Sequence, residues 1–222
     1  MENHDFKGLM IGDKAPRFIA NSTDGEIKLS DYMGKWLIFF SHPGDYTPVC
    51  TTEFIEFAKM NTEFKKRNCN LLGLSIDSTP SHISWLTNIH NTTGIKIPFP
   101  VVSDRDMKIS KMYGMIAPNI SNTETVRSVF IIDPNQVIRA ILQYPKTNGR
   151  NIGEILRLLD ALQTTDKEKV ATPANWILGK STILPAPNTF KEALENKNNF
   201  NNNCTDWYLC YNNRFEPYNF FN

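Results

Sequence analysis

The feature that most constrains the fold is a short apolar run followed closely by an amphipathic segment. Residues 36–41 (WLIFFS) have the length and composition of a buried strand, and residues 48–67 carry apolar side chains near helical spacing. The same alternation continues downstream, with strands expected at 70–76, 126–132 and 136–142 and helices at 80–90, 104–114 and 149–163. Asp133-Pro134-Asn135 predicts a tight turn, and so an antiparallel hairpin, between the last two strands. The pattern predicts an α/β fold with a central mixed β-sheet flanked by helices.

The composition changes after about residue 165. Residues 171–187 hold three prolines with little periodicity, and 11 of the last 35 residues are asparagine. We therefore expect a main domain at 1–165 and a small C-terminal extension domain at 166–222, with an Asn-rich insertion at 196–203.

Charge and apolar runs exclude several classes of protein. With 24 basic and 23 acidic residues the net charge is +1, so no nucleic-acid partner is expected. No apolar run approaches the roughly 18 residues of a membrane span, and the amino terminus lacks a signal-peptide pattern, which predicts a cytoplasmic protein. His82 and His90 lie on one expected helix without an evident cysteine or carboxylate cluster, so no metal site is expected. The four cysteines are interpreted as thiols, at most one of them chemically special.

The segment between the first expected strand and helix carries the chemistry. Thr47 suits the N-cap, Pro48 the first helical position, and Cys50 falls in the first turn, where a helix N-terminus favours a thiolate. A free cysteine has a pKa of about 8.5, so a reactive thiolate needs about 3 kcal/mol of stabilisation, whereas the helix end supplies about 2 kcal/mol at most. A cation is therefore required. Arg127 begins an expected buried strand, and from the residues alone it could pair either with this sulfur or with a carboxylate such as Glu53.

A family resemblance favours the sulfur of Cys50 as the partner of Arg127. Pro43, Thr47 and Cys50, spaced P-x-x-x-T-x-x-C, resemble the active-site motif of the peroxiredoxins, and VRSVFIIDP places Arg127 at that family's active-site arginine. The string SHPGDYTPVCTTE is most similar to the one-cysteine, peroxiredoxin-6-like branch. The resemblance covers nearly everything before the Asn-rich tail, and it implies a thioredoxin-like fold and a homodimer.

The resemblance also implies a role for each site residue. Cys50 attacks a hydroperoxide and becomes a sulfenic acid, which an external thiol, glutathione or a thioredoxin-like protein, reduces without any cofactor. Arg127 stabilises the thiolate and the developing charge, Thr47 contributes a hydroxyl, and Pro43 shields the site from water. His42 and Glu53 are supporting candidates. The alternative for His42 is a strand-end histidine that makes one backbone hydrogen bond.

The sequence departs from related patterns at several positions. Thr172 stands where two-cysteine peroxiredoxins have their resolving cysteine, and Cys69 is interpreted as a buried apolar residue. Cys204 and Cys210 could reach a sulfenic acid in a dimer partner, but we interpret them as incidental thiols. The lipase serine of some peroxiredoxin-6-like relatives is missing near residues 33–36, so no phospholipase activity is expected. The alternative function is a non-catalytic thioredoxin-like redox adaptor or chaperone; a disulfide oxidoreductase is disfavoured because no C-x-x-C occurs.

Overall fold

The computed structural model describes residues 8–198 and 203–212 and divides the chain into two compact units, residues 1–152 and 153–222. None of the helices in the described ranges is long and apolar enough to cross a membrane. The domain boundary expected at 165/166 stays a prediction.

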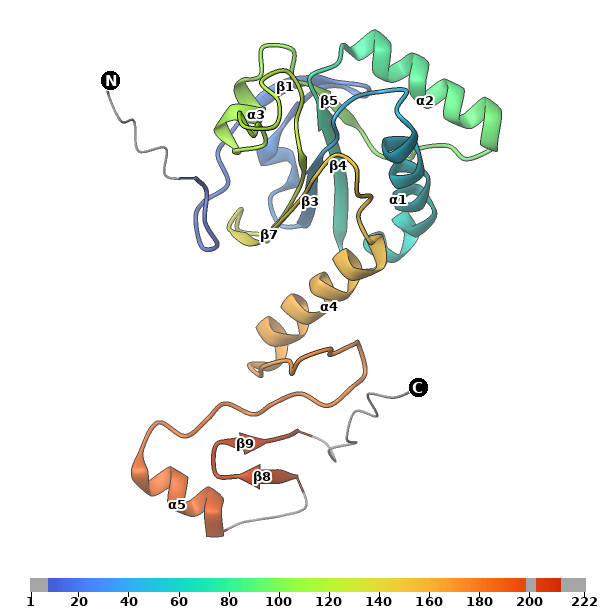
Figure 1. The fold of residues 1–222 in the computed structure, drawn as a ribbon. Helices are drawn as coiled ribbons and strands as arrows, with labels where there is room; N and C mark the ends of the chain where they lie inside the picture. Colours follow the sequence, from blue (N-terminus) through green and yellow to red (C-terminus); the bar gives the residue numbers. More distant parts are fainter. Residues whose placement is uncertain (1–7, 199–202, 213–222) are drawn as a thin grey trace, which may run out of the picture. The chain divides into compact units, whose positions relative to one another are not determined.

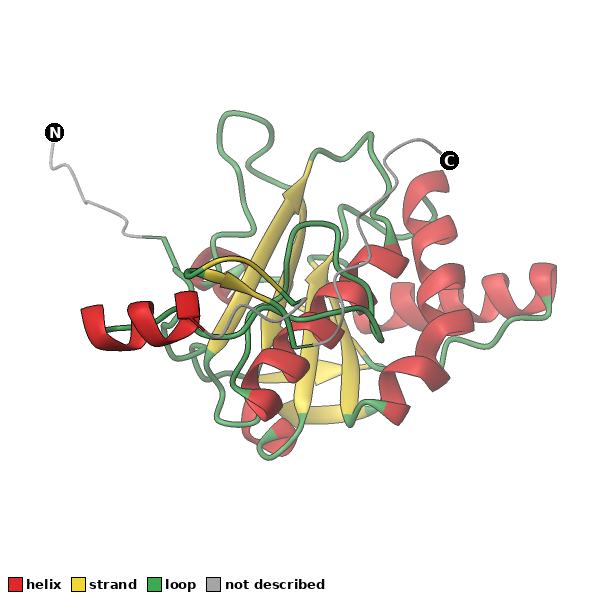
Figure 2. Cartoon of the chain, turned by 90° about the horizontal axis from the view of Figure 1, so that it is seen from below, coloured by secondary structure: helices red, strands yellow, loops and turns green. Residues whose placement is uncertain are grey.

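The first unit is built on a seven-stranded mixed sheet (Figure 1), whose twist is visible in Figure 2. The strands run in the order β2-β1-β5-β4-β3-β6-β7. Their bounds are β1 Ile19–Ser22, β2 Gly25–Lys28, β3 Trp36–Ser41, β4 Cys69–Ser75, β5 Val101–Ser103, β6 Arg127–Ile132 and β7 Ile138–Tyr144. β3 pairs parallel with β4 and antiparallel with β6. The mixed α/β prediction is confirmed.

The two faces of β3 carry two separate parts of the core. Phe39 points to one face and lies edge-on to Tyr113, just beyond α3 (Lys108–Met112). Phe40 points to the other face and stacks on Phe57 of α1 (Pro48–Lys66), with ring centroids 4.3 Å apart. Trp85 of α2 (Thr79–Thr93) joins that second face through Phe54. Alternate residues of one strand thus bury both faces of the sheet, which fixes α1 against the centre of the sheet.

The expected hairpin is present and its turn is the predicted one. The backbone N–H of Gln136 donates to the carbonyl of Asp133 across 2.9 Å, with Pro134 at the second position of the turn. The carboxylate of Asp133 also accepts from the N–H groups of Asn135 and Val137, each at 2.9 Å. β6 and β7 pair antiparallel on either side of this turn.

Two expected helices begin later than the sequence pattern suggests. Of the helix expected at 104–114, only α3 is helical. The carboxylate of Asp104 accepts hydrogen bonds from the N–H groups of Ile109 and Ser110, so residues 104–107 form a loop that leads into the helix. Met107 at its N-cap has a left-handed φ of 56°. The helix expected at 149–163 is α4 (Ile152–Glu168), and the N–H of Arg150, just before it, donates to Glu53 across 2.8 Å.

The second unit contains most of α4, together with α5 (Phe190–Asn198) and a small hairpin of β8 (Cys204–Asp206) and β9 (Leu209–Cys210). The hairpin register places Cys204 opposite Cys210, and the two form a disulfide. The interpretation of both as thiols is therefore wrong; their separation of six residues gave no sign that a strand pair would bring them together. Of the Asn-rich insertion at 196–203, residues 196–198 extend α5 and 199–202 lie outside the described residues.

Candidate active site

The loop from β3 into α1 positions the candidate thiol. Thr47 has the extended backbone of an N-cap and Pro48 occupies the start of the helix, as predicted. The Thr47 hydroxyl does not cap the helix; it donates to the Gly44 carbonyl across 2.9 Å. Its oxygen lone pairs are thereby left to accept a hydrogen bond from another molecule. Pro43 is buried in the same loop, in keeping with a shielding role.

Cys50 lies in the first turn of α1, is fully buried, and is a free thiol. Nη1 of Arg127, at the start of β6, donates to its sulfur across 3.3 Å. Backbone N–H groups of the first turn add to the positive potential there. A buried cation beside a cysteine at a helix N-terminus is the environment that activates a sulfur nucleophile.

Arg127 binds both partners that the sequence left open, the sulfur of Cys50 and the carboxylate of Glu53. The same Nη1 that contacts Cys50 also donates to Oε2 of Glu53 across 2.8 Å. Nε and Nη2 both donate to the carbonyl of Lys146, at 3.0 and 2.6 Å. Arg127 is 2% exposed, so these contacts hold the guanidinium in one orientation with one edge toward the sulfur.

Glu53 binds a second buried arginine that the sequence did not single out. Nε and Nη2 of Arg150 donate to the two carboxylate oxygens of Glu53, at 2.9 and 2.6 Å. The remaining Nη1 donates to the carbonyls of Ser41 and Ser128. Since Arg150 and Glu53 are 97 residues apart, no local pattern joins them, and the apolar periodicity of the sequence could not have paired them.

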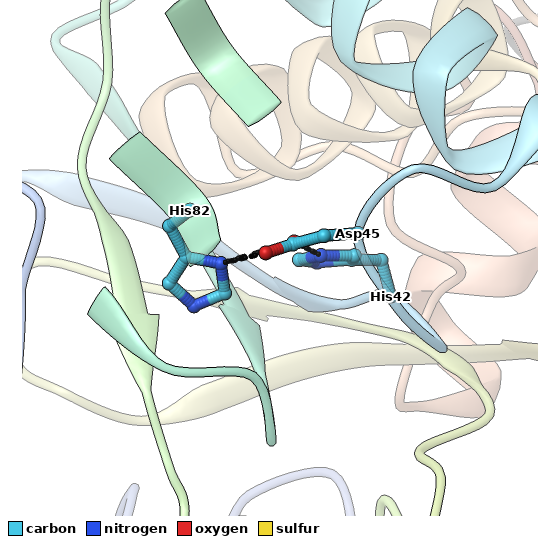
Figure 3. A group of neighbouring side chains, drawn as sticks. All are labelled: His42, Asp45 and His82. Carbon is cyan, nitrogen blue, oxygen red and sulfur yellow. Dashed lines mark hydrogen bonds and ion pairs between the residues drawn. The ribbon is translucent and has the colours of Figure 1, made fainter. Parts of the chain in front are cut away.

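A second buried cluster adjoins the same loop, and Figure 3 shows its three side chains. Nε2 of His42 lies 3.0 Å from Oδ1 of Asp45, and Nδ1 of His82 lies 2.9 Å from Oδ2. The sequence showed no cysteine or carboxylate cluster beside His82 and His90, but the fold brings one carboxylate, that of Asp45, to His82. The donor atoms of the three residues lie within 4.8 Å of one another, close enough to hold a metal ion.

His42 makes the backbone hydrogen bond of a strand-end residue, and its predicted supporting role in the site stays a prediction. Its backbone N–H donates to the carbonyl of Leu74 across 2.9 Å, as expected of a strand-end residue. Its ring contacts Asp45 and stacks on Trp85 with centroids 5.2 Å apart. Burial lowers the pKa of His42, which favours the neutral ring. Burial alone would raise the pKa of Asp45, but hydrogen bonds from His42 and His82 outweigh it and hold that pKa well below its usual range.

Cys69 behaves as predicted for a small buried apolar residue. It lies at the start of β4 and is 1% exposed. Burial raises the pKa of its thiol to about 12, so it remains protonated at neutral pH. Cys50 and Cys69 are the two free cysteines of the described residues, and they differ in their partners: Arg127 donates to the sulfur of Cys50, whereas the sulfur of Cys69 contacts the carbonyl of Asn70.

Comparison with known proteins agrees with this geometry. A family model described as "AhpC/TSA family" matches residues 11–141, and one described as "C-terminal domain of 1-Cys peroxiredoxin" matches residues 161–199. The chain is 58% identical over 202 residues to "Peroxiredoxin 2" of Caldanaerobacter subterraneus subsp. tengcongensis, covering 90% of this chain and 91% of the relative. It is 49% identical to "Peroxiredoxin" of Aquifex aeolicus, covering 90% and 95%.

Solved structures give the same result. A yeast mitochondrial 1-Cys peroxiredoxin, studied for thiol resolution via glutathione/thioredoxin systems, superposes with a TM-score of 0.79 at 40% identity, over 91% of this chain and 98% of its own. A cysteine-to-serine mutant of peroxiredoxin 6 of Arenicola marina gives a TM-score of 0.82 at 34% identity, over 92% and 97%.

Proposed function

The chain belongs to the AhpC/TSA family of peroxiredoxins and is a thiol-dependent peroxidase, and on this premise we propose that Cys50 is the cysteine that reduces the hydroperoxide. The observation that carries the proposal is the 3.3 Å hydrogen bond from Arg127 to the fully buried Cys50 sulfur. A cation held this close stabilises negative charge on the sulfur and attracts the oxygens of a peroxide.

In the proposed reaction the Cys50 thiolate attacks the terminal oxygen of the hydroperoxide. The sulfur–oxygen bond forms as the oxygen–oxygen bond breaks, which oxidises the sulfur to a sulfenic acid and reduces the peroxide. The departing alkoxide or hydroxide takes a proton from water and leaves as an alcohol or as water. Hydrogen peroxide and organic hydroperoxides both fit this scheme.

The residues around Cys50 each have a role in the proposed reaction. Arg127 donates to the sulfur and to the negative charge that develops on the peroxide oxygens. Thr47, whose hydrogen is used by Gly44, accepts from the peroxide O–H. Glu53 holds Arg127 in place at 2.8 Å, and Pro43 excludes water from the loop.

The test compares the wild-type protein with Cys50→Ser in stopped-flow mixing with hydrogen peroxide and with tert-butyl hydroperoxide. We expect rapid oxidation of the wild type, a sulfenic acid on Cys50 that dimedone traps, and no reaction of the variant above background. A Cys50→Ser protein that still consumes peroxide at the wild-type rate would refute the proposal. A non-catalytic redox adaptor would show no such reaction in either protein.

For regeneration we propose an external thiol, since peroxiredoxins use external reductants and need no cofactor. Support for glutathione or a thioredoxin-like protein comes from the yeast relative, whose thiol resolution is described as proceeding via glutathione/thioredoxin systems. Cys204 and Cys210, which form a disulfide, could compete as an internal source of thiol only after a reductant has opened that disulfide. Steady-state turnover of the Cys204→Ser/Cys210→Ser double variant separates the two. Undiminished turnover with glutathione or thioredoxin supports direct reduction, and its loss refutes it.

We also propose that the protein is a homodimer, in which the extension 166–222 contributes to the contact. Large apolar side chains of the second unit support this, because they stand exposed in the single chain: Phe190 is 80% exposed and Tyr208 53%. Light scattering after size exclusion tests it, with a monomer at micromolar concentration as the refuting result.

The cytoplasmic location stays a prediction, and cell fractionation tests it.

A further inference from the structure

The buried cluster of His42, Asp45 and His82 is not used by the proposed reaction, yet it forms part of the same loop (Figure 3). His42 and Asp45 precede α1, and His82 lies in the first turn of α2. Both histidine side chains are fully buried and the Asp45 side chain is 2% exposed. Polar groups buried this completely generally have at least one hydrogen-bond partner, so an exception needs an explanation.

The partners of His82 determine where its hydrogens are. Nε2 lies 3.2 Å from the carbonyl oxygen of Val102, which can only accept. Nδ1 lies 3.0 and 2.9 Å from the two carboxylate oxygens of Asp45, which also accept because this carboxyl group is held ionised. A neutral imidazole carries one N–H and would turn a lone pair toward one of these acceptors. Both nitrogens of His82 therefore carry hydrogens.

The carboxylate of Asp45 in turn determines the state of His42. It accepts from the hydroxyl of Ser81 across 2.8 Å and faces Nε2 of His42 at 3.0 Å. The hydrogen of the neutral His42 ring therefore lies on Nε2. Its Nδ1 is buried with no hydrogen-bond partner among the described residues, which costs about 1–3 kcal/mol unless another molecule supplies a donor.

The His42 ring is packed against the start of the catalytic helix. It stacks on Trp85, whose Nε1–H donates to the hydroxyl of Thr51, the residue after Cys50. Its edge contacts Phe54, one turn beyond Cys50, with ring centroids 4.8 Å apart. Arg127 can only donate hydrogen bonds, whereas a hydroperoxide has an O–H that needs an acceptor. An unprotonated nitrogen in this region offers a second acceptor for a peroxide O–H, beside the hydroxyl of Thr47.

We propose that Asp45 and a doubly protonated His82 are positioning residues, which anchor the active-site loop on α2 and hold His42 as the Nε2–H tautomer, so that Nδ1 remains a hydrogen-bond acceptor. The inference rests on the proposed role of Cys50. The pair acts through His42 and the loop and does not itself contact the reacting sulfur. A metal ion bound by His42, Asp45 and His82 would take the place of the hydrogens between their side chains. The experiment distinguishes a metal-bound cluster from a hydrogen-bonded one.

The test joins ring nitrogen NMR with kinetics. In the wild type at neutral pH, we expect both ring nitrogens of His82 to carry hydrogens and the single hydrogen of His42 to lie on Nε2. Asp45→Asn preserves the shape, but its amide can donate to Nε2 of His42 and so shift the hydrogen to Nδ1. We expect that variant to show the tautomer shift and to lose about tenfold or more in the rate constant for peroxide, as misplacement of a reacting group does.

The matched control is Ser84→Ala. Ser84 bonds the hydroxyl of Tyr46 at 2.6 Å, so its loss loosens the same loop on α2 without altering the histidine cluster. We expect this variant to keep the wild-type tautomer of His42 and a rate within about threefold of the wild type, since the contact is exposed.

Several results would overturn the inference. These are a singly protonated His82 in the wild type, an unchanged His42 tautomer in Asp45→Asn, or a tautomer shift with no loss of rate. A stoichiometric divalent metal in the purified protein, removed by chelation together with activity, would also overturn it. The wild-type spectrum decides the protonation state even if Asp45→Asn does not fold. Failure of the proposed role of Cys50 can be told apart from failure of this inference, because it would be seen as peroxide consumption that does not depend on Cys50.

Discussion

Replacing Arg127 by alanine removes the one side chain that, among the described residues, contacts both the sulfur and its supporting carboxylate. Arg127 donates to Cys50 at 3.3 Å, to Glu53 at 2.8 Å, and twice to the carbonyl of Lys146. In the variant the sulfur loses its cation, and the Lys146 carbonyl loses both donors. Glu53 keeps Arg150, so the buried carboxylate is not left unpaired. We therefore expect a folded protein with a defective thiol.

The size of the defect follows from the contacts. A hydrogen bond to a charged group contributes about 1.5–3 kcal/mol, and each 1.4 kcal/mol corresponds to about a tenfold change in rate. A donor aimed at charge that develops in the transition state contributes about 10²–10³ in rate. Because the single guanidinium serves the sulfur and the peroxide oxygens, we expect the second-order rate constant for hydrogen peroxide to fall by about 10²–10³. Stopped-flow oxidation measures it, and alkylation of Cys50 by iodoacetamide at about pH 6 reports separately on the thiolate.

Arg150→Lys is the matched control. Arg150 binds the same carboxylate at 2.6 Å and is also buried, but among its described contacts none is to Cys50. Its replacement should lower the free energy of unfolding while the peroxide rate falls much less than in Arg127→Ala. Equal losses of rate in the two variants would show that the arginines act only by holding the fold. An Arg127→Ala protein with the wild-type rate would refute the assignment of the site.

Three further predictions concern the surroundings of the site. Because burial lowers the pKa of His42, the unfolded chain binds more protons below about pH 6.5. Between about pH 6.5 and pH 5 chemical denaturation should therefore show stability that falls as the pH falls, with a further loss at lower pH as Asp45 is protonated; constant stability across that range would contradict this. Cys69, with a pKa of about 12, should resist alkylation in the native protein but react after unfolding, as mass spectrometry would detect; native labelling would contradict it. Gly73→Ala places a methyl group 3.3 Å from the ring tip of Phe54, so we expect a loss of about 1–3 kcal/mol, measured as a lower Tm, whereas an unchanged Tm would show that the ring moves freely.

The residues of the candidate site that lie close together in the chain could be recognised from the sequence. Pro43, Thr47 and Cys50 lie within eight residues of each other, at a strand-to-helix junction whose helix start can be recognised from Thr47 and Pro48. Arg127 could be singled out because it begins a strongly apolar strand. The choice between sulfur and carboxylate could not be made from the residues alone, since it depends on the three-dimensional distances, and these allow one guanidinium nitrogen to bond both.

The contacts that were missed join residues far apart in the chain. Arg150 meets Glu53 across 97 residues, and Asp45 meets His82 across 37. Neither pairing produces a periodic pattern in the sequence. Among the fold elements, β5 has three residues and β1 and β2 four each, too short for alternation to stand out from the surrounding loops. β5 nevertheless matters, because its Val102 carbonyl accepts from His82.

The buried triad of Arg127, Glu53 and Arg150 has a consequence for the catalytic cycle. Two guanidinium groups and one carboxylate leave a formal charge of +1 among buried side chains, and a thiolate at Cys50 would bring the sum to zero. In the proposed cycle, oxidation of Cys50 to a sulfenic acid would remove that anion and leave the buried charges unbalanced. The imbalance should make the oxidised protein easier to open around α1, where a reductant must gain access to the sulfur.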